Sequence, residues 1–192
     1  MSEPYQIPSL SEEPRDLALG QYMDAWSRME GFVQMIFREL LGTDGNAAMA
    51  VFASMGTKQM KDVLTALGAI RLTNDGAKRL GTLCERLTKQ NTKRNHIVHG
   101  AWSTVVIISD APEGRKKITT TWVRRYIPVQ HEAAQNAARY DLPKVGGVTA
   151  FTIPQLNVTR THVLALMGDF STFYGEIPSL RKPDPQPDPE PM

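Results

Sequence analysis

The residues best suited to chemistry lie in one short segment, Lys89–Gly100, which holds Arg94, Asn95 and two histidines, His96 and His99. An arginine guanidinium can hold two oxygens of a phosphate at once. A histidine imidazole titrates near neutral pH and can act as a general acid or base. A cation that can bind an anion, Arg94, and a group that can transfer a proton, His99, therefore lie within about one and a half turns of a helix.

Arg94 interrupts an apolar stripe. The helix that carries it has Leu80, Cys84 and Leu87 on one face, and continuing this stripe at helical spacing leads to Arg94. A buried guanidinium without a partner is costly. We therefore expect either that this end of the helix reaches solvent or that Arg94 has an arranged partner or ligand.

Glu30 is a matching anomaly in the first helix, because it shares a stripe with Trp26 and Val33. A carboxylate in such a stripe usually has a partner. One hypothesis pairs Glu30 with Arg94 or His99 across a helix–helix contact. The alternative places Glu30 at the edge of the stripe, where it reaches water.

The spacing of the segment limits what one helix can do. Asn95 and His99 are four residues apart and share a face. Arg94 and His99 are five apart, which is roughly 140° around a regular helix. One helix does not aim both at one point unless Gly100 ends it or a dimer pools two such ends. His96 and His99 could also seat a metal, but Asp and Glu are absent nearby.

Arg94-Asn95-x-x-x-His99 at the end of a helix, in a chain with several helices, resembles the HEPN superfamily. The resemblance implies a symmetric dimer that cleaves RNA without metal or cofactor, by attack of a 2′-hydroxyl on phosphorus to give a cyclic phosphate. It implies that Arg94 holds the phosphate, that Asn95 bonds it or orients His99, and that His99 is the acid or base, with Glu30 and His96 in support. Where some toxin-type members carry a tyrosine, this chain has Ala101. A non-catalytic interaction or RNA-binding module using the same groove is the alternative.

Basic and aromatic residues beside this segment suggest a nucleic-acid surface. The candidates are Lys89, Lys93, Lys116, Lys117, Arg124 and Arg125. Trp102 and Trp122 can either stack on bases or pack within the fold. A second Arg–His pair, Arg125 and His131, flanks Pro128 at a strand end, and we treat it as incidental.

The elements that must position these residues follow from periodicity. Helices are predicted over residues 12–41, 46–72 with a break near 54–57, 75–99, and from about 153 to Tyr174, the last begun by a capping box at Thr152–Gln155. Val- and Thr-rich runs at 104–109 and 118–127, separated by a turn, predict an antiparallel hairpin, and 149–151 a short strand. The expected fold is mainly α, a four- to five-helix HEPN-like bundle with an inserted β-hairpin.

Composition limits the setting. The chain of 192 residues is 41% hydrophobic and 22% charged, with net charge +2 and one cysteine, which excludes disulfide scaffolds and thiolate zinc sites. No apolar run suits a membrane span or signal peptide. We expect a flexible segment 1–11, a single domain 12–177 with the hairpin at about 103–127, and a disordered Pro-rich tail 178–192 that a protein partner can bind. The expected location is cytoplasmic and the expected role defensive, similar to a toxin.

Overall fold

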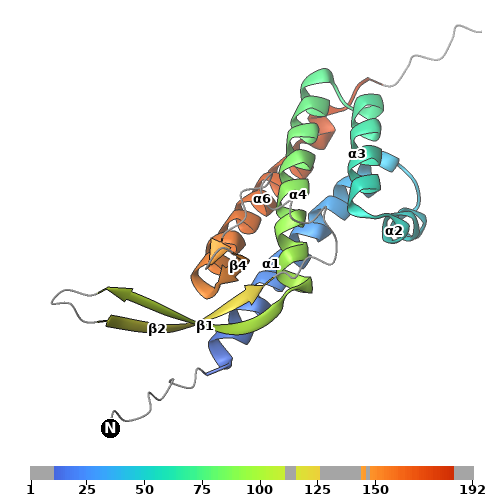
Figure 1. Ribbon diagram of the computed structural model, residues 1–192. Helices are drawn as coiled ribbons and strands as arrows, with labels where there is room; N and C mark the ends of the chain where they lie inside the picture. The colour runs from blue at the N-terminus through green and yellow to red at the C-terminus, as the bar shows by residue number, and fades with distance from the viewer. Residues whose placement is uncertain (1–10, 111–115, 126–143, 146–147, 184–192) are drawn as a thin grey trace, which may run out of the picture. The chain divides into compact units, whose positions relative to one another are not determined.

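The chain is mainly helical, with a small antiparallel sheet (Figure 1). The computed structural model describes residues 11–110, 116–125, 144–145 and 148–183. In chain order the elements are α1 (Glu13–Leu41), α2 (Gly45–Ser54), α3 (Thr57–Arg71), α4 (Asn74–His99), β1 (Ala101–Asp110), β2 (Lys116–Arg125), β3 (Lys144–Val145), β4 (Val148–Thr152) and α6 (Ile153–Leu180). The predicted helices, the break between 54 and 57 and the hairpin are confirmed.

The chain groups into two compact units. Unit 1 comprises residues 1–27 and 89–164, and unit 2 comprises residues 28–88 and 165–192. Helices α1, α4 and α6 each supply residues to both units. Each unit is described by itself below, within the ranges given above.

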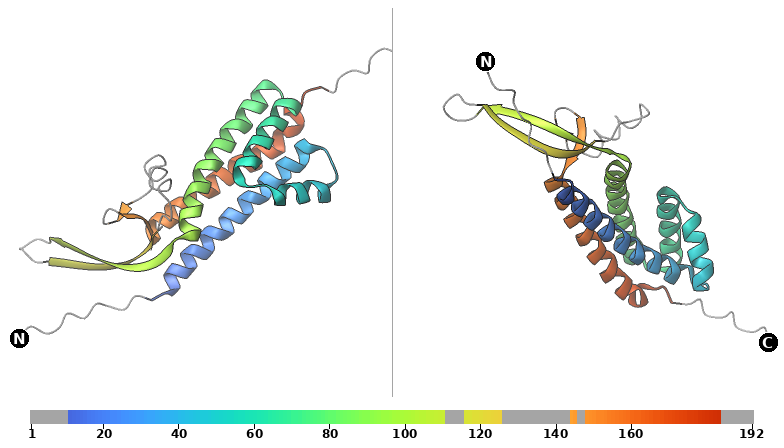
Figure 2. Two further views of the ribbon diagram at one scale, coloured as in Figure 1. Left: turned by 45° about the vertical axis from the view of Figure 1, so that its right-hand side comes forward. Right: turned by 90° about the horizontal axis from the view of Figure 1, so that it is seen from below.

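Unit 1 holds the sheet and the end of α4. Strands follow the order β1-β2-β4-β3 with antiparallel pairing, and Trp102 of β1 lies opposite Arg124 of β2. Figure 2 shows β1 following directly from α4 and pairing with β2 in a long ribbon. The predicted capping box begins α6: the backbone N–H of Thr152 donates to Gln155 Oε1 at 2.9 Å. Buried apolar side chains of this unit include Ala18, Tyr22, Trp26, Ile97, Val123, Phe151, Leu156 and Val163.

The described residues of unit 2 are helical apart from short connections and an isolated bridge between Leu72 and Arg181. Its buried side chains include Val33, Ile36, Phe37, Leu64, Leu80, Leu87, Phe170 and Phe173. The rings of Phe37 and Phe52 meet edge to face, with centroids 5.6 Å apart, and join α1 to α2. A Cβ added at Gly68 of α3 would lie 2.9 Å from a methyl carbon of Leu80, so glycine allows α3 and α4 to approach closely.

Helix α6 is longer than predicted. It ends at Leu180 rather than at about Tyr174, and it includes Pro178. Ile177 is fully buried, and the carbonyl of Leu180 accepts a hydrogen bond of 2.8 Å from the backbone of Thr73. These contacts outweigh the missing N–H of the proline.

Arg181 and Lys182, just after α6, are bonded to the end of α3 and the residue after it, whereas we predict a disordered tail from residue 178. The backbone N–H of Lys182 donates to the carbonyl of Arg71 at 2.9 Å, and Arg181 forms an antiparallel bridge with Leu72. Residues 1–10 of the predicted flexible N-terminus and 184–192 of the tail lie outside the described residues.

The composition predicts no membrane-spanning helix and a cysteine that forms no internal disulfide. Within the described ranges, no helix is both long and apolar enough to cross a bilayer. Cys84 is a buried free thiol on α4, and burial raises its pKa to about 11. Cys84 therefore packs as a small apolar residue in the protonated state.

Candidate functional site

The last turn of α4 is fixed by an arginine from the hairpin. Arg124 of β2 donates from Nε to the carbonyl of Ile97 at 2.5 Å and from Nη2 to the carbonyl of Val98 at 2.7 Å. The last carbonyls of a helix have no partner within the helix, and they carry its negative dipole end. A cation that donates to two of them stabilises the helix end that carries His99.

Arg124 therefore has a structural role, and the nucleic-acid contact expected of it stays a prediction. Its guanidinium carbon lies 5.6 Å from the centroid of the Trp102 ring, and its side chain is half-buried. Burial lowers the pKa of Arg124, and the nearby charge of Arg15 lowers it further. With its donors on backbone carbonyls and one face on an indole, this guanidinium is committed to the fold.

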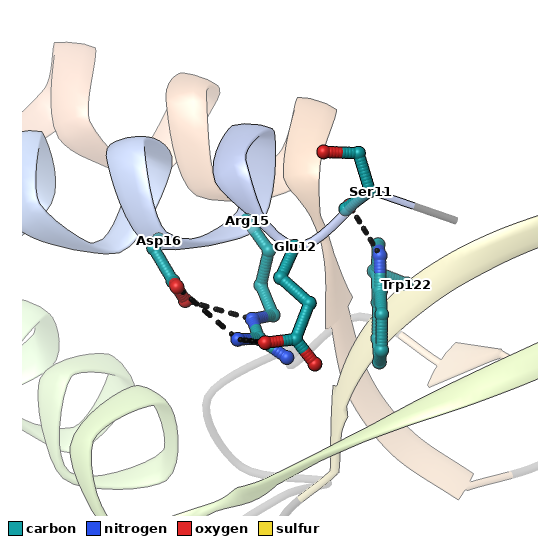
Figure 3. Close-up of polar contacts among 5 residues, drawn as sticks. All are labelled: Ser11, Glu12, Arg15, Asp16 and Trp122. Carbon is teal, nitrogen blue, oxygen red and sulfur yellow. Dashed lines mark hydrogen bonds and ion pairs between the residues drawn. The ribbon is translucent and has the colours of Figure 1, made fainter. Parts of the chain in front are cut away.

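Trp122 packs against the start of α1, as one of the two alternatives for it predicts (Figure 3). Its indole N–H donates to the carbonyl of Ser11 at 3.0 Å, and Arg15 lies over its ring at 4.9 Å. Arg15 in turn contacts Asp16 at 2.8 Å and Glu12 at 2.9 Å. Hydrogen bonds that Arg15 donates to Asp16, and then to Glu12, raise its pKa. This cluster attaches the start of α1 to the hairpin.

Arg94 lies half-buried against α1. Its guanidinium carbon is 6.0 Å from the centroid of the Trp26 ring, and its Nη1 donates to Asn95 Oδ1 at 3.2 Å. Its Nε is buried without a hydrogen-bond partner. Within the part of the chain that the structure describes, no carboxylate pairs with it. The partners that the structure describes for Arg94 are thus an aromatic ring and an amide, with no carboxylate among the described residues.

The two histidines of the segment differ in environment. His99 is exposed at the end of α4, whereas His96 is buried, with 5% of its surface exposed. Burial lowers the pKa of His96, so its imidazole is neutral at pH 7. Among the described residues, no group of three or more His, Cys, Asp or Glu side chains is placed to hold a metal ion.

The structure joins some predicted site residues and leaves others apart. It brings Arg94 to Asn95, but no hydrogen bond connects Arg94 with His99. Glu30 is half-buried and belongs to unit 2, so its pairing with Arg94 or His99 in unit 1 stays a prediction.

The remaining basic candidates are only partly described. Lys89 is exposed and Lys93 is half-buried on α4. The side chains of Lys116, Lys117 and Arg125 and the whole of His131 lie outside the described residues.

Buried polar atoms without a partner gather in unit 1. They are Tyr22 Oη, Trp26 Nε1, Gln90 Oε1, Arg94 Nε, Trp102 Nε1 and Ser103 Oγ. In the sequence, Tyr22 and Trp26 are large residues spaced four apart in the first helix. The signal available in the sequence was that both side chains carry a polar atom, which usually needs a hydrogen-bond partner when it is buried.

Comparisons with known proteins neither support nor contradict the resemblance that the motif from Arg94 to His99 suggests. No family model, curated protein or solved structure matches the chain. The function must therefore be inferred from the residues and their contacts alone.

Proposed function

We propose that the chain is a metal-independent endoribonuclease of the HEPN type, with an active site completed by a second copy of the chain. The observation that carries the proposal is Arg94: a half-buried guanidinium that pairs with no carboxylate of the described residues, bonded to Asn95, on the last turns of a helix that ends with the exposed His99. An uncompensated cation beside a titratable group suits an anionic substrate.

The proposed reaction needs one anion-binding group and two proton transfers. The 2′-hydroxyl of the RNA attacks the adjacent phosphorus, the bond from phosphorus to the 5′ oxygen breaks, and a cyclic phosphate and a 5′-hydroxyl result. Arg94 stabilises the added charge on the phosphate oxygens. His99 makes one of these transfers, taking the proton of the 2′-hydroxyl or giving one to the leaving oxygen, and water makes the other. The nucleophile belongs to the substrate, so the step needs no metal.

A second copy is part of the proposal because of the geometry of one chain. Arg94 lies against Trp26, whereas His99 is exposed and shares no hydrogen bond with it. Two chains related by a two-fold axis can bring Arg94 of one copy to His99 of the other.

The competing proposal is a non-catalytic RNA-binding module. One reason for it is that Arg94 and His99 of one chain share no hydrogen bond. Another is that Arg94 contacts an aromatic ring, an arrangement that suits binding as well as catalysis. In this case Arg94 holds a phosphate and His99 transfers no proton.

Cleavage of RNA in EDTA tests the two proposals. We expect wild type to cut single-stranded RNA, and His99→Ala and Arg94→Ala each to lose activity by about a hundredfold or more, because general acid–base and electrostatic catalysis contribute on this scale. The matched controls are His162→Ala, an exposed histidine of α6, and Arg86→Ala, an exposed arginine bonded to Asp169. RNA that is bound but left intact by wild type would favour the module.

A further inference from the structure

Two buried polar side chains on the face of α1 that meets Arg94 have unmet hydrogen-bonding capacity, as does Arg94 itself. Tyr22 and Trp26 are four residues apart on α1 and so share a face. They are 0% and 2% exposed, and Tyr22 Oη and Trp26 Nε1 have no hydrogen-bond partner among the described residues. The ring of Trp26 faces the Arg94 guanidinium, whose Nε also lacks a partner.

The chemistry of this set points to an anion. A phenol O–H, an indole N–H and a guanidinium N–H are all donors, and the guanidinium carries a positive charge that no carboxylate neutralises in the described part of the chain. Buried donors without acceptors are rare in native proteins and each requires an explanation, such as a bound ion or water. An oxyanion supplies both the acceptors and the opposite charge.

We propose that Tyr22, Trp26 and Arg94 bind one phosphate-sized oxyanion group, either the terminal phosphate of an RNA or free inorganic phosphate. This deepens the proposed function, because it shares Arg94 with the nuclease site: the bound oxyanion and the scissile phosphodiester compete for the same guanidinium. An internal phosphodiester continues on both sides and needs two exits from a site. A terminal phosphate has one covalent attachment and a free phosphate ion has none, so either can reach donors as buried as Tyr22 Oη and Trp26 Nε1.

Electrostatics at Tyr22 agrees with this assignment. Burial raises the pKa of the Tyr22 phenol, while the Arg94 charge partly opposes that rise. The phenol therefore keeps its proton at neutral pH and acts as a donor.

Calorimetric titration with inorganic phosphate tests the site in the full-length protein. We expect saturable binding by wild type and at least about a tenfold loss of affinity in Tyr22→Phe, Trp26→Phe and Arg94→Gln, because each removes a bond to a charged ligand. The matched controls are Tyr174→Phe and Arg86→Gln, whose residues lie in unit 2. No saturable binding, or equal losses in the controls, would overturn the proposal.

Thermal unfolding separates a bound anion from a bound water. Tyr22→Phe removes a hydroxyl that lacks a partner in the absence of ligand, so we expect its Tm without phosphate to equal or exceed that of wild type, and phosphate to raise it less. If a buried water satisfies the hydroxyl instead, Tyr22→Phe lowers the Tm and leaves phosphate affinity unchanged. That result contradicts the anion site.

Two further arms identify the source of the phosphate and keep this proposal distinct from the nuclease. Tighter binding of oligoribonucleotides ending in a phosphate than of the same sequences ending in hydroxyls assigns the group to RNA, and equal binding assigns it to the free ion; both support the site. His99→Ala is expected to retain phosphate binding. Phosphate binding without cleavage would reject only the nuclease, and cleavage without phosphate binding would reject only this site.

Discussion

At the scale of single residues, the environment of a side chain determines its chemistry more than its place in a motif does. His96 and His99 are three residues apart, yet one is buried and the other exposed. Arg94 and Arg124 both face indoles, yet only Arg124 has its donors on backbone carbonyls. The described contacts of Arg124 thus give it a structural role, whereas those of Arg94 leave its Nε without an acceptor among the described residues.

The buried His96 makes stability depend on pH. Burial holds its pKa in the folded state below that of the unfolded chain, so the unfolded state binds a proton more readily. The free energy of unfolding should therefore be highest above about pH 6.5, the ordinary histidine value, and should fall as the pH drops below it. Urea unfolding between pH 5 and 8 measures the slope.

The control for this slope is a second histidine. Replacing His96 with Gln should flatten the dependence of unfolding on pH whatever it does to absolute stability, and replacing the exposed His162 should leave the dependence as it is. An unchanged slope in His96→Gln would assign the pH dependence to other groups.

At the scale of elements, the predictable parts were those set by local signals. The capping box at Thr152 and the break before Thr57 are signalled by neighbouring residues, and both are found. The extension of α6 through Pro178 depends on the burial of Ile177 and on a bond to Thr73, which are distant in sequence. The role of Arg124 depends on sheet register, which a list of basic residues does not contain.

The hairpin supports the end of α4 through Arg124, and this can be measured. Arg124→Met should lower the free energy of unfolding by about 2 kcal/mol, because two carbonyls at the end of the helix lose a charged donor. Arg160→Met is the control, since Arg160 is half-buried and donates one bond, of 2.7 Å, to Gln21. Equilibrium unfolding in urea measures both.

If Arg124 instead contacts nucleic acid, Arg124→Met would weaken RNA binding and leave stability nearly unchanged. Arg124→Lys refines the test, because a lysine keeps the charge but cannot reach both carbonyls with a planar group. We expect it to recover only part of the lost stability.

At the scale of the whole molecule, the sequence indicated which residues carry chemistry but not whether they meet. The helical spacing of Arg94 and His99 already argued against convergence within one chain, and the structure joins Arg94 to Asn95 and Trp26 instead. The orphan donors of Tyr22 and Trp26 could not be recognised from an apolar stripe, because burial without a partner is a property of packing.

Mixing two inactive variants decides whether the proposed active site is shared between chains. If Arg94 of one copy acts with His99 of the other, each heterodimer of Arg94→Ala and His99→Ala contains one intact site. Random reassortment makes half of the dimers mixed, so roughly a quarter of wild-type activity should return. RNA cleavage in EDTA, before and after the two proteins are unfolded and refolded together, measures the recovery. If both groups of a site come from one chain, no mixture restores activity, and light scattering that shows only a 21.4 kDa species would exclude the shared site outright.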